Sequence, residues 1–280
     1  MQMEIKNRIN LLDSEIYYEI CGEGIPVLMI HGWSVDHRLM SGCMEPVFAL
    51  HPIQFMRIYI DLPGMGLSKA GESIRCSDQV LDVILAFIDT VIPGQKFLLA
   101  GESYGGLLSR GLLRKRCEEI LGLLLICPSV TPDQSKRNVP PFTVMKKDAE
   151  FLSSLSFTER TAFTWINVVQ TQSVWDKFKT DVYPAITLYD RAFLDHRLEG
   201  AFSYEVDPLE KPFEKPCLIL AGRQDSSVGY KDQFTLLEDY PHASFAILDR
   251  AGHNLQIEQE GLFNSLVSEW LDRVVEKMQD

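Results

Sequence analysis

The sequence lacks both a long apolar run and a cluster of basic residues. Its longest apolar stretch, residues 120–127, is far shorter than the roughly 20 residues that a membrane-spanning helix needs. The 280 residues include 27 Lys and Arg against 39 Asp and Glu, a net charge of −12. The densest basic stretch, residues 110–116, is expected to be the exposed face of a helix. We therefore expect neither a membrane nor a nucleic acid as partner, and the sequence indicates no oligomeric state.

Signals for disulfides, export and metal binding are also missing. The six cysteines show no C-x-x-C spacing, and Cys21, Cys127 and Cys217 lie in or beside apolar runs, where they would serve as small core residues. The first residues, MQMEIK, contain no apolar core of a signal peptide. No H-E-x-x-H motif and no phosphate-binding glycine loop occur. We expect a reduced, cytoplasmic protein that uses no metal or other cofactor.

Short apolar runs alternate with helical patterns along most of the chain. The predicted strands are residues 15–20, 26–30, 55–60, 97–100, 121–126, 217–220 and 244–248. From Val27 on these runs are continuously apolar, which is typical of parallel strands that are covered on both faces. Residues 262–275 repeat apolar side chains at helical spacing, and Ser77 is a plausible N-cap of an earlier helix. The pattern predicts an α/β fold with a mostly parallel central sheet flanked by helices.

One long stretch interrupts this alternation. Residues 128–216 show no strand pattern, although a crossover between parallel strands needs far fewer residues. Helical patterns cover residues 142–155, 158–170 and 184–198 inside it. We predict a helical cap, residues 131–208, inserted into a core domain formed by residues 1–130 and 209–280. Most of its aromatic side chains should pack the cap helices together, and Trp165 and Phe193 are candidates to face the substrate pocket.

A serine motif follows one of the apolar strands directly. Residues 101–105 read G-E-S-Y-G, after the apolar run 97–100 and before a helical pattern over 107–117. A strand, Gly-x-Ser-x-Gly and a helix form the layout of a nucleophile elbow, in which a strained turn exposes the serine hydroxyl. Gly105 and Gly106 provide room for the helix to approach the strand. The motif is short enough to recur by chance, so Ser103 becomes a candidate nucleophile through its agreement with other positions.

An acid and a base come after two later strands. Asp225 follows the run 217–220, and His253 follows the run 244–248. The chain order Ser103, Asp225, His253 is the order found in α/β-hydrolases. A carboxylate at Asp225 could accept the Nδ1 proton of His253 and so hold its tautomer. Asp249 also leaves a late strand and is the alternative acid, but we favour Asp225.

The loop after the strand at residues 26–30 reads H-G-W-S. In hydrolases with a serine elbow, one oxyanion donor is the amide after the nucleophile, and the other comes from the loop after an earlier strand. Those donors would here be the backbone amides of Tyr104 and Trp33. Gly32 would let the loop turn toward the substrate, so His31 and Gly32 are expected beside the pocket.

Together with D-L-P-G-M-G-L-S at residues 61–68, these motifs resemble those of the α/β-hydrolase superfamily with a cap domain. The group includes small esterases, C–C bond hydrolases and lactonases, and the resemblance covers nearly the whole chain. It implies the α/β-hydrolase fold with a cap after the sixth strand that roofs the site. Ser103 at the elbow argues against the dehalogenase branch, which uses an aspartate nucleophile.

The resemblance implies a serine hydrolase with a Ser103–His253–Asp225 triad and no cofactor. Its expected substrate is a small ester, thioester or lactone, cleaved through an acyl-enzyme. Two alternatives remain open at this point. The same residues could serve a C–C bond hydrolase acting on a β-diketone-like compound, or a ligand-binding protein that turns over slowly.

Overall fold

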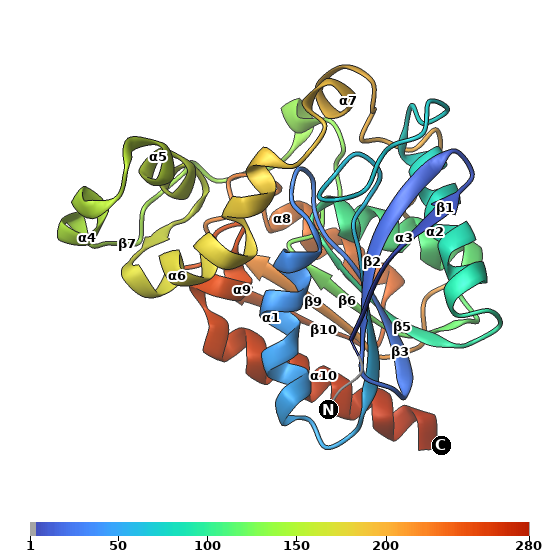
Figure 1. Cartoon of the computed structure of the whole chain (residues 1–280). Coiled ribbons are helices and arrows are strands. Elements are labelled where there is room, and N and C mark those ends of the chain that lie inside the picture. Colours follow the sequence, from blue (N-terminus) through green and yellow to red (C-terminus); the bar gives the residue numbers. More distant parts are fainter. Residues whose placement is uncertain (1–3, 280) are drawn as a thin grey trace.

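The computed structural model describes residues 4–279 and contains a central sheet of eight strands (Figure 1). Their order across the sheet is β1-β2-β4-β3-β5-β6-β9-β10. The β1–β2 and β2–β4 pairs are antiparallel, and all other neighbours are parallel. The bounds are β1 (Glu4–Leu11), β2 (Ser14–Cys21), β3 (Ile25–Ile30), β4 (Phe55–Ile60), β5 (Phe97–Glu102), β6 (Ile120–Ile126), β9 (Cys217–Gly222) and β10 (Ala243–Leu248). The predicted mostly parallel sheet is confirmed.

The edge strand β1 was not predicted from the sequence. Its polar residues Lys6, Asn7, Arg8 and Asn10 interrupt the few apolar ones, and most of its side chains are exposed. Pairing with β2 along its whole length holds it in the sheet. Because β1 lies at the edge of the sheet and pairs only with β2, it needs fewer apolar residues than the strands that are buried on both faces.

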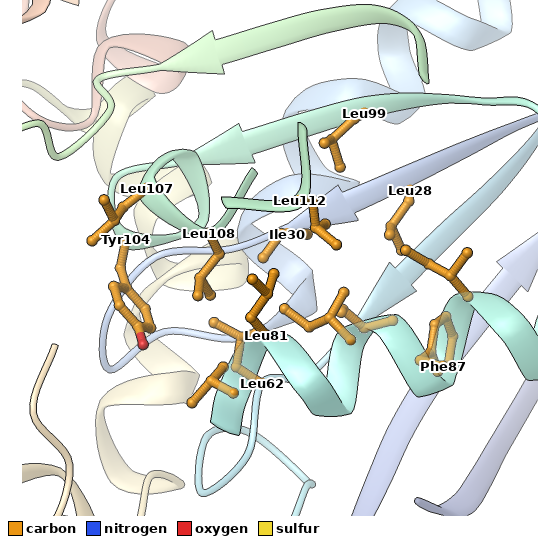
Figure 2. Packing of buried hydrophobic residues seen from close by; sticks show 14 of the residues in the cluster. Leu28, Ile30, Leu62, Leu81, Phe87, Leu99, Tyr104, Leu107, Leu108 and Leu112 are labelled. Atoms are coloured by element: carbon orange, nitrogen blue, oxygen red, sulfur yellow. The ribbon is translucent and has the colours of Figure 1, made fainter. Parts of the chain in front are cut away.

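Alternate side chains of the buried strands belong to two separate apolar layers. Val27 and Met29 pack with α1 (His37–Leu50) and α10 (Glu260–Gln279) on one face of the sheet. Leu28 and Ile30 pack with α2 (Ser77–Val91) and α3 (Tyr104–Arg116) on the other. Figure 2 shows this second layer, in which Leu81 and Phe87 of α2 and Leu108 and Leu112 of α3 lie over β3 and β5.

The helices predicted near residues 77 and 262–275 are confirmed as α2 and α10. The cap of α2 differs from the prediction: Cys76 is the N-cap, and its backbone N–H donates to Oε1 of Gln79 at 3.0 Å. Ser77 is instead the first helical residue, and its hydroxyl is hydrogen-bonded to Tyr104 Oη at 2.8 Å. No helix within residues 4–279 is both long and apolar enough to cross a membrane.

The inserted segment, residues 127–216 between β6 and β9, is largely helical but differs in detail from the prediction. It contains η1 (Gln134–Lys136), β7 (Lys146–Lys147), α4 (Ala149–Ser154), α5 (Phe157–Ile166), β8 (Val169–Gln170), α6 (Gln172–Asp181), η2 (Tyr183–Thr187) and α7 (Arg191–His196). The helix predicted over 142–155 is limited to α4. The helix predicted over 158–170 ends at Ile166, because β8 pairs with β7 in a two-residue parallel ladder that the sequence did not predict. The predicted helix over 184–198 is divided between η2 and α7.

Part of the inserted segment shares its apolar core with the sheet. Phe163 of α5 and Trp175 and Phe178 of α6 are buried in the same cluster as Leu39 and Val47 of α1. In Figure 1, α4, α5 and α6 extend from one side of the sheet, and α7 lies near the top. The assignment of residues 131–208 as a separate cap domain stays a prediction. The remaining helices follow β9 and β10: α8 (Lys231–Phe234), η3 (Thr235–Asp239) and α9 (Leu255–Glu258).

A substitution at Gly105 tests how closely α3 approaches the sheet. A Cβ at this position would lie 2.2 Å from the carbonyl oxygen of Ile30, which is backbone and has little freedom to move. We expect Gly105→Ala to destabilise the fold by about 1–3 kcal/mol, as overpacking of a core does. Gly261→Ala in α10 is the matched control, because nothing lies within 4 Å of its added Cβ. Thermal unfolding that ranked the two variants equally would contradict the close approach.

Candidate active site

Ser103 occupies the turn between β5 and α3 in a strained backbone conformation. Its φ is 52° and its ψ is −113°, a region that residues with a Cβ seldom adopt. Its N–H donates to the carbonyl of Ile126 at 3.0 Å, and its own carbonyl accepts from the N–H of Ser129 at 2.9 Å. The surrounding backbone therefore holds the turn in place. This geometry is that of a nucleophile elbow.

The structure brings Ser103, His253 and Asp225 together from three loops far apart in the chain. The Ser103 Oγ lies 3.0 Å from His253 Nε2, and His253 Nδ1 lies 2.9 Å from Asp225 Oδ2. In the neutral imidazole, the carboxylate accepts the proton on Nδ1, so Nε2 is left to accept from the serine hydroxyl. The arrangement matches the relay of nucleophile, base and orienting acid in a hydrolytic triad.

Asp225 is fully buried and is held by more than the imidazole. Its Oδ1 accepts the backbone N–H groups of Ser227 at 2.8 Å and Val228 at 3.1 Å. Burial opposes ionisation, but the charge and hydrogen bond of His253 and these two amides outweigh it, so the pKa of Asp225 is lowered. Asp249 is exposed, so of the two acids considered the structure places Asp225 beside the histidine.

A second carboxylate reaches the same imidazole. Glu102 is buried, and its Oε1 lies 3.4 Å from His253 Nε2, on the side of the ring that faces Ser103. Burial raises the pKa of Glu102 to about 7, with the Asp225 charge adding to the rise and the His253 charge opposing it. The sequence placed Glu102 beside the nucleophile but did not indicate its contact with the base.

The pKa of His253 reflects both carboxylates. Burial lowers it, but the charge and hydrogen bond of Asp225, followed by the charge of Glu102, outweigh burial and raise the pKa to about 9. An unperturbed histidine titrates near 6.5. The site therefore favours the imidazolium more than the surroundings of an unperturbed histidine do.

Trp33 and Tyr104 lie next to each other at the serine. Their rings meet edge to face with centroids 5.1 Å apart, and both residues line the cavity beside Ser103. The amide of Tyr104 is in the first turn of α3, where helix N–H groups have no acceptor within the helix. The structure thus brings both predicted oxyanion residues to the site.

A cavity of about 600 Å³ opens onto Ser103 and His253. The core contributes Trp33, Val35, Leu39 and Tyr104, and the inserted segment contributes Ala162, Trp165, Ile166, Phe178, Val182, Ile186 and Tyr189. Its lining is therefore mainly apolar, with Ser103 and His253 and a few further polar side chains, among them Gln134, Arg137 and Thr161, as is usual for sites that bind small molecules. Trp165 is 82% exposed, which places it at the rim of the cavity.

The structure corrects the prediction that Phe193 faces the pocket. Phe193 is buried outside the cavity lining, with its ring against the backbone of Gly64. The guanidinium of Arg197 lies 4.6 Å from the ring centre. The aromatic side chain therefore fastens α7 to the loop after β4 and contributes no wall to the cavity.

His31 and Gly32 likewise lie outside the cavity lining. His31 is fully buried, and its Nε2 accepts the backbone N–H of Leu62 at 2.9 Å. At Gly32, an added Cβ would come 2.1 Å from Oε2 of Glu102 and 3.0 Å from Cβ of Ser103. The absence of a side chain at Gly32 thus lets the loop after β3 lie close to the elbow at Ser103.

Glu258 in α9 connects the histidine loop to the inserted segment, a role that no pattern in the sequence indicates. Its Oε2 accepts the N–H of Gly252 at 2.5 Å, and its Oε1 accepts the N–H groups of Val168 at 2.5 Å and Val169 at 3.1 Å. Burial raises the pKa of Glu258 to about 7, against the lowering by these three amides. One buried carboxylate thus joins the residue before His253 to the end of α5.

A second contact reinforces this connection. Asn254, which follows His253 and lines the cavity, donates from Nδ2 to Asn167 Oδ1 at 3.0 Å. Asn167 in turn donates from its own Nδ2 to the carbonyl of Phe163 at 2.9 Å. The loop that carries His253 and the helix α5, which lines the cavity, therefore share one buried hydrogen-bond network.

Asp36, His37 and Asp61 present ligand atoms within 4.8 Å of one another, a spacing that a metal ion could use. Hydrogen bonds within the protein already engage these atoms. His37 Nδ1 lies 2.8 Å from Asp61 Oδ1 and Nε2 lies 3.3 Å from a Glu19 carboxylate oxygen, while Asp36 pairs with Arg38. The cluster holds the start of α1 against the loop after β4.

Cys127, Asp225 and His253 form a second group of potential ligands with the same spacing. Two of its members are the hydrogen-bonded pair described above, and Asp225 also accepts two backbone amides. The Sγ of Cys127 is buried and lies 3.7 Å from the carbonyl oxygen of Gly252. In this group, Asp225 therefore orients the imidazole of His253.

Comparison with known proteins gives consistent results. The model of the alpha/beta hydrolase family matches residues 27–265. Pimeloyl-[acyl-carrier protein] methyl ester esterase of Legionella pneumophila is 23% identical over 257 residues, covering 91% of this chain and 99% of that protein. The superfamily protein YisY of Bacillus subtilis is 24% identical over 268 residues, with 91% and 94% covered.

Solved structures share the fold. An alpha/beta superfamily hydrolase from Oenococcus oeni superposes with a TM-score of 0.86 at 29% identity, covering 96% of this chain and 99% of that one. A thermophilic esterase from Thermogutta terrifontis superposes with a TM-score of 0.66 at 20% identity, covering 96% and 99%. At the latter identity the likeness shows the fold alone.

The contact between Glu102 and His253 can be tested by titration. We expect the imidazole of His253 to titrate near 9 in NMR spectra of its ring protons. Glu102→Gln removes a negative charge that favours the imidazolium, so the pKa of His253 should fall. Glu260→Gln, at a partly exposed carboxylate paired with Lys177, is the matched control and should leave the His253 titration unchanged. An unchanged His253 titration in Glu102→Gln would show that the second carboxylate does not act on the base.

Proposed function

This chain belongs to the alpha/beta hydrolase family, and we propose that it is a serine hydrolase that cleaves a small carboxylic ester, thioester or lactone through an acyl-enzyme. The observation that carries the proposal is the hydrogen-bonded series from Ser103 Oγ through His253 to the buried Asp225, at 3.0 Å and 2.9 Å. Ser103 lies in a strained turn, and its hydroxyl both contacts His253 and lines the cavity.

In the proposed reaction, His253 Nε2 takes the proton of Ser103 as Oγ attacks the carbonyl carbon. The resulting imidazolium is stabilised by Asp225 at Nδ1 and by Glu102 near Nε2. It then protonates the leaving oxygen or sulfur, which departs with its bonding electrons, and the acyl group stays on Oγ. Water, deprotonated by His253, attacks the ester so formed and returns Ser103 and the carboxylic acid.

The amides of Tyr104 and Trp33 are the proposed oxyanion donors. Negative charge that develops on the carbonyl oxygen is best stabilised by donors that are already oriented, because no reorganisation is then needed during the reaction. The position of Tyr104 at the start of α3 adds the positive end of the helix dipole. Trp33 is held beside it by the edge-to-face ring contact.

The cavity supports a small substrate. Its volume of about 600 Å³ suits a compact molecule, and its apolar walls come from both the core and the inserted segment. We propose that the inserted segment acts as the predicted cap and excludes bulk water during acyl transfer. The name of the Legionella relative refers to hydrolysis of a methyl ester, which supports the ester class.

Activity on model substrates tests the proposal. Wild-type protein should hydrolyse short-chain esters or lactones in preference to amides and β-diketones, and a fluorophosphonate should label Ser103. Ser103→Ala should lose on the order of 10⁶ in kcat if the triad acts as a unit. Asp225→Asn should lose about 10⁴, because His253 would take the wrong tautomer. Asp249→Asn, at the exposed competing acid, is the control, and labelling that persisted in Ser103→Ala would refute the assignment.

Glu258 should act as a positioning residue for His253. In Glu258→Gln one amide N–H₂ would face a backbone donor, at Gly252 or at Val168 and Val169, so the histidine loop should shift. Because small misplacements of reacting groups are costly, we expect kcat to fall about 10-fold or more with little change in KM.

The matched control for this change is Glu260→Gln. Glu260 also pairs with the inserted segment, through Lys177 Nζ at 2.9 Å, but both side chains are partly exposed to solvent. An exposed ion pair contributes little, so kcat should be nearly unchanged. If Glu258→Gln lowered only the thermal midpoint and left kcat and its pH profile intact, Glu258 would be structural and would not position the base.

A further inference from the structure

Arg137 is the one lysine or arginine side chain among the cavity-lining residues that the structure describes. It follows η1 at the start of the inserted segment and is partly buried. The acidic and histidine side chains of the lining are Glu102 and His253, which contact each other at 3.4 Å. Arg137 thus brings the cavity a positive charge at a separate point of its wall.

Carbonyl oxygens hold the guanidinium of Arg137. Its Nε donates to the carbonyl of Thr131 at 2.7 Å, its Nη1 to that of Ser227 at 3.0 Å, and its Nη2 to that of Pro132 at 3.0 Å. Nη2 also lies 3.4 Å from Ser129 Oγ. Within residues 4–279 its bonds are all to neutral oxygens, and none is an ion pair with a carboxylate. The group is fixed in position while its charge has no contacting counterion there.

These contacts also place Arg137 near the reacting groups. The N–H of Ser129 donates to the carbonyl of Ser103 at 2.9 Å, and the N–H of Ser227 donates to Asp225 Oδ1 at 2.8 Å. Arg137 therefore bridges the loop that fixes the nucleophile and the loop that carries the acid. Its charge acts on His253, whose pKa it lowers.

The guanidinium keeps its charge in this position. Burial lowers the pKa of Arg137, while Asp225, Asp232 and Asp133 raise it from a distance. Arginine remains protonated in proteins under such conditions. A charged group in a mainly apolar cavity is stabilised most by an anion that enters with the ligand, since charge-assisted hydrogen bonds are stronger than neutral ones.

We propose that Arg137 is an anion subsite of this cavity, and that the preferred substrate is an ester or lactone that carries a carboxylate away from the scissile carbonyl. The inference rests on the proposed hydrolase function and narrows its substrate class. A carboxylate bound at Arg137 would orient the substrate along the cavity with its ester at Ser103. Selectivity would come from this charge, with the apolar walls limiting chain length.

The test uses pairs of substrates that differ only in charge. One series consists of methyl half-esters of dicarboxylic acids with four to eight carbons, each paired with the methyl ester whose carboxylate is replaced by a carboxamide. A second series consists of O-acetyl ω-hydroxy acids and their carboxamides, which move the anion to the leaving group. In one series the wild-type kcat/KM should favour the carboxylate by about 10- to 100-fold at the best chain length.

Variants at Arg137 identify the source of the preference. In Arg137→Gln the ratio of kcat/KM for the carboxylate to that for the carboxamide should fall to about 1. Arg137→Lys should retain part of the preference, because lysine keeps the positive charge but lacks the planar guanidinium. The matched control is Arg223→Gln, in the loop after β9. Arg223 is exposed, lies 4.4 Å over the Tyr230 ring and is outside the cavity lining, so the ratio should stay at its wild-type value.

The outcomes separate the two proposals. Equal kcat/KM for carboxylates and carboxamides in both series would overturn the anion subsite and leave the hydrolase function standing. Turnover of none of the esters, with no fluorophosphonate labelling of Ser103, would overturn the hydrolase function itself. If Arg137→Gln fails to fold, the wild-type protein is inhibited competitively with dicarboxylates and with their diamides. Tighter inhibition by the dicarboxylates would support the anion subsite, and equal or tighter inhibition by the diamides would refute it.

Discussion

A serine with a positive φ must be held by its surroundings, because the conformation is unfavourable for a residue with a Cβ. Here the backbone of Ser103 is bonded on one side to the end of β6 and on the other to the loop that follows it. Gly101 and Gly105 allow α3 to lie within van der Waals contact of the strand ends. The position of every other group in the site depends on this turn, since it fixes the hydroxyl, the amide of Tyr104 and the direction of α3 together.

Around the imidazole, two buried carboxylates have different environments. Asp225 accepts two backbone amides besides the histidine, and its pKa is lowered even though it is buried. Glu102 has less hydrogen-bond support, so burial raises its pKa. The two groups thus favour ionisation to different degrees within reach of one base. Glu102, with a pKa of about 7, and His253, with a pKa of about 9, are therefore the groups around the imidazole that change protonation between neutral and alkaline pH, while Asp225 stays ionised.

The sequence contained most of what defines the sheet and the triad. Continuous apolar runs identified the buried strands, and the serine, aspartate and histidine followed such runs in the order typical of the family. The edge strand β1 escaped prediction because its Lys6, Arg8 and Asn10 resemble a polar loop. Helix α6 was missed because its apolar residues Val174, Trp175 and Phe178 form a short stripe between polar ones.

Side-chain orientation was the part that sequence could not supply. Trp165 and Phe193 have similar local patterns, yet one lies at the rim of the cavity and the other is buried against Gly64. Glu102 and Glu258 are ordinary acidic residues in the sequence, and only the fold brings them to His253 and to the amides of the inserted segment. Such contacts join residues about 90 to 150 positions apart, beyond the range of local patterns.

The carboxylate of Glu258 also limits how the inserted segment can be exchanged. Two of its three backbone donors belong to that segment, so a shorter loop in its place would leave a buried charge with a single partner. A transplanted cap would have to present N–H groups at the same point, or arrive together with a neutral residue at position 258. Among natural relatives, residue 258 should therefore covary with the backbone geometry at 167–169. Chimeras that ignore this pairing would fail at the histidine loop, far from the junctions where the foreign sequence begins and ends.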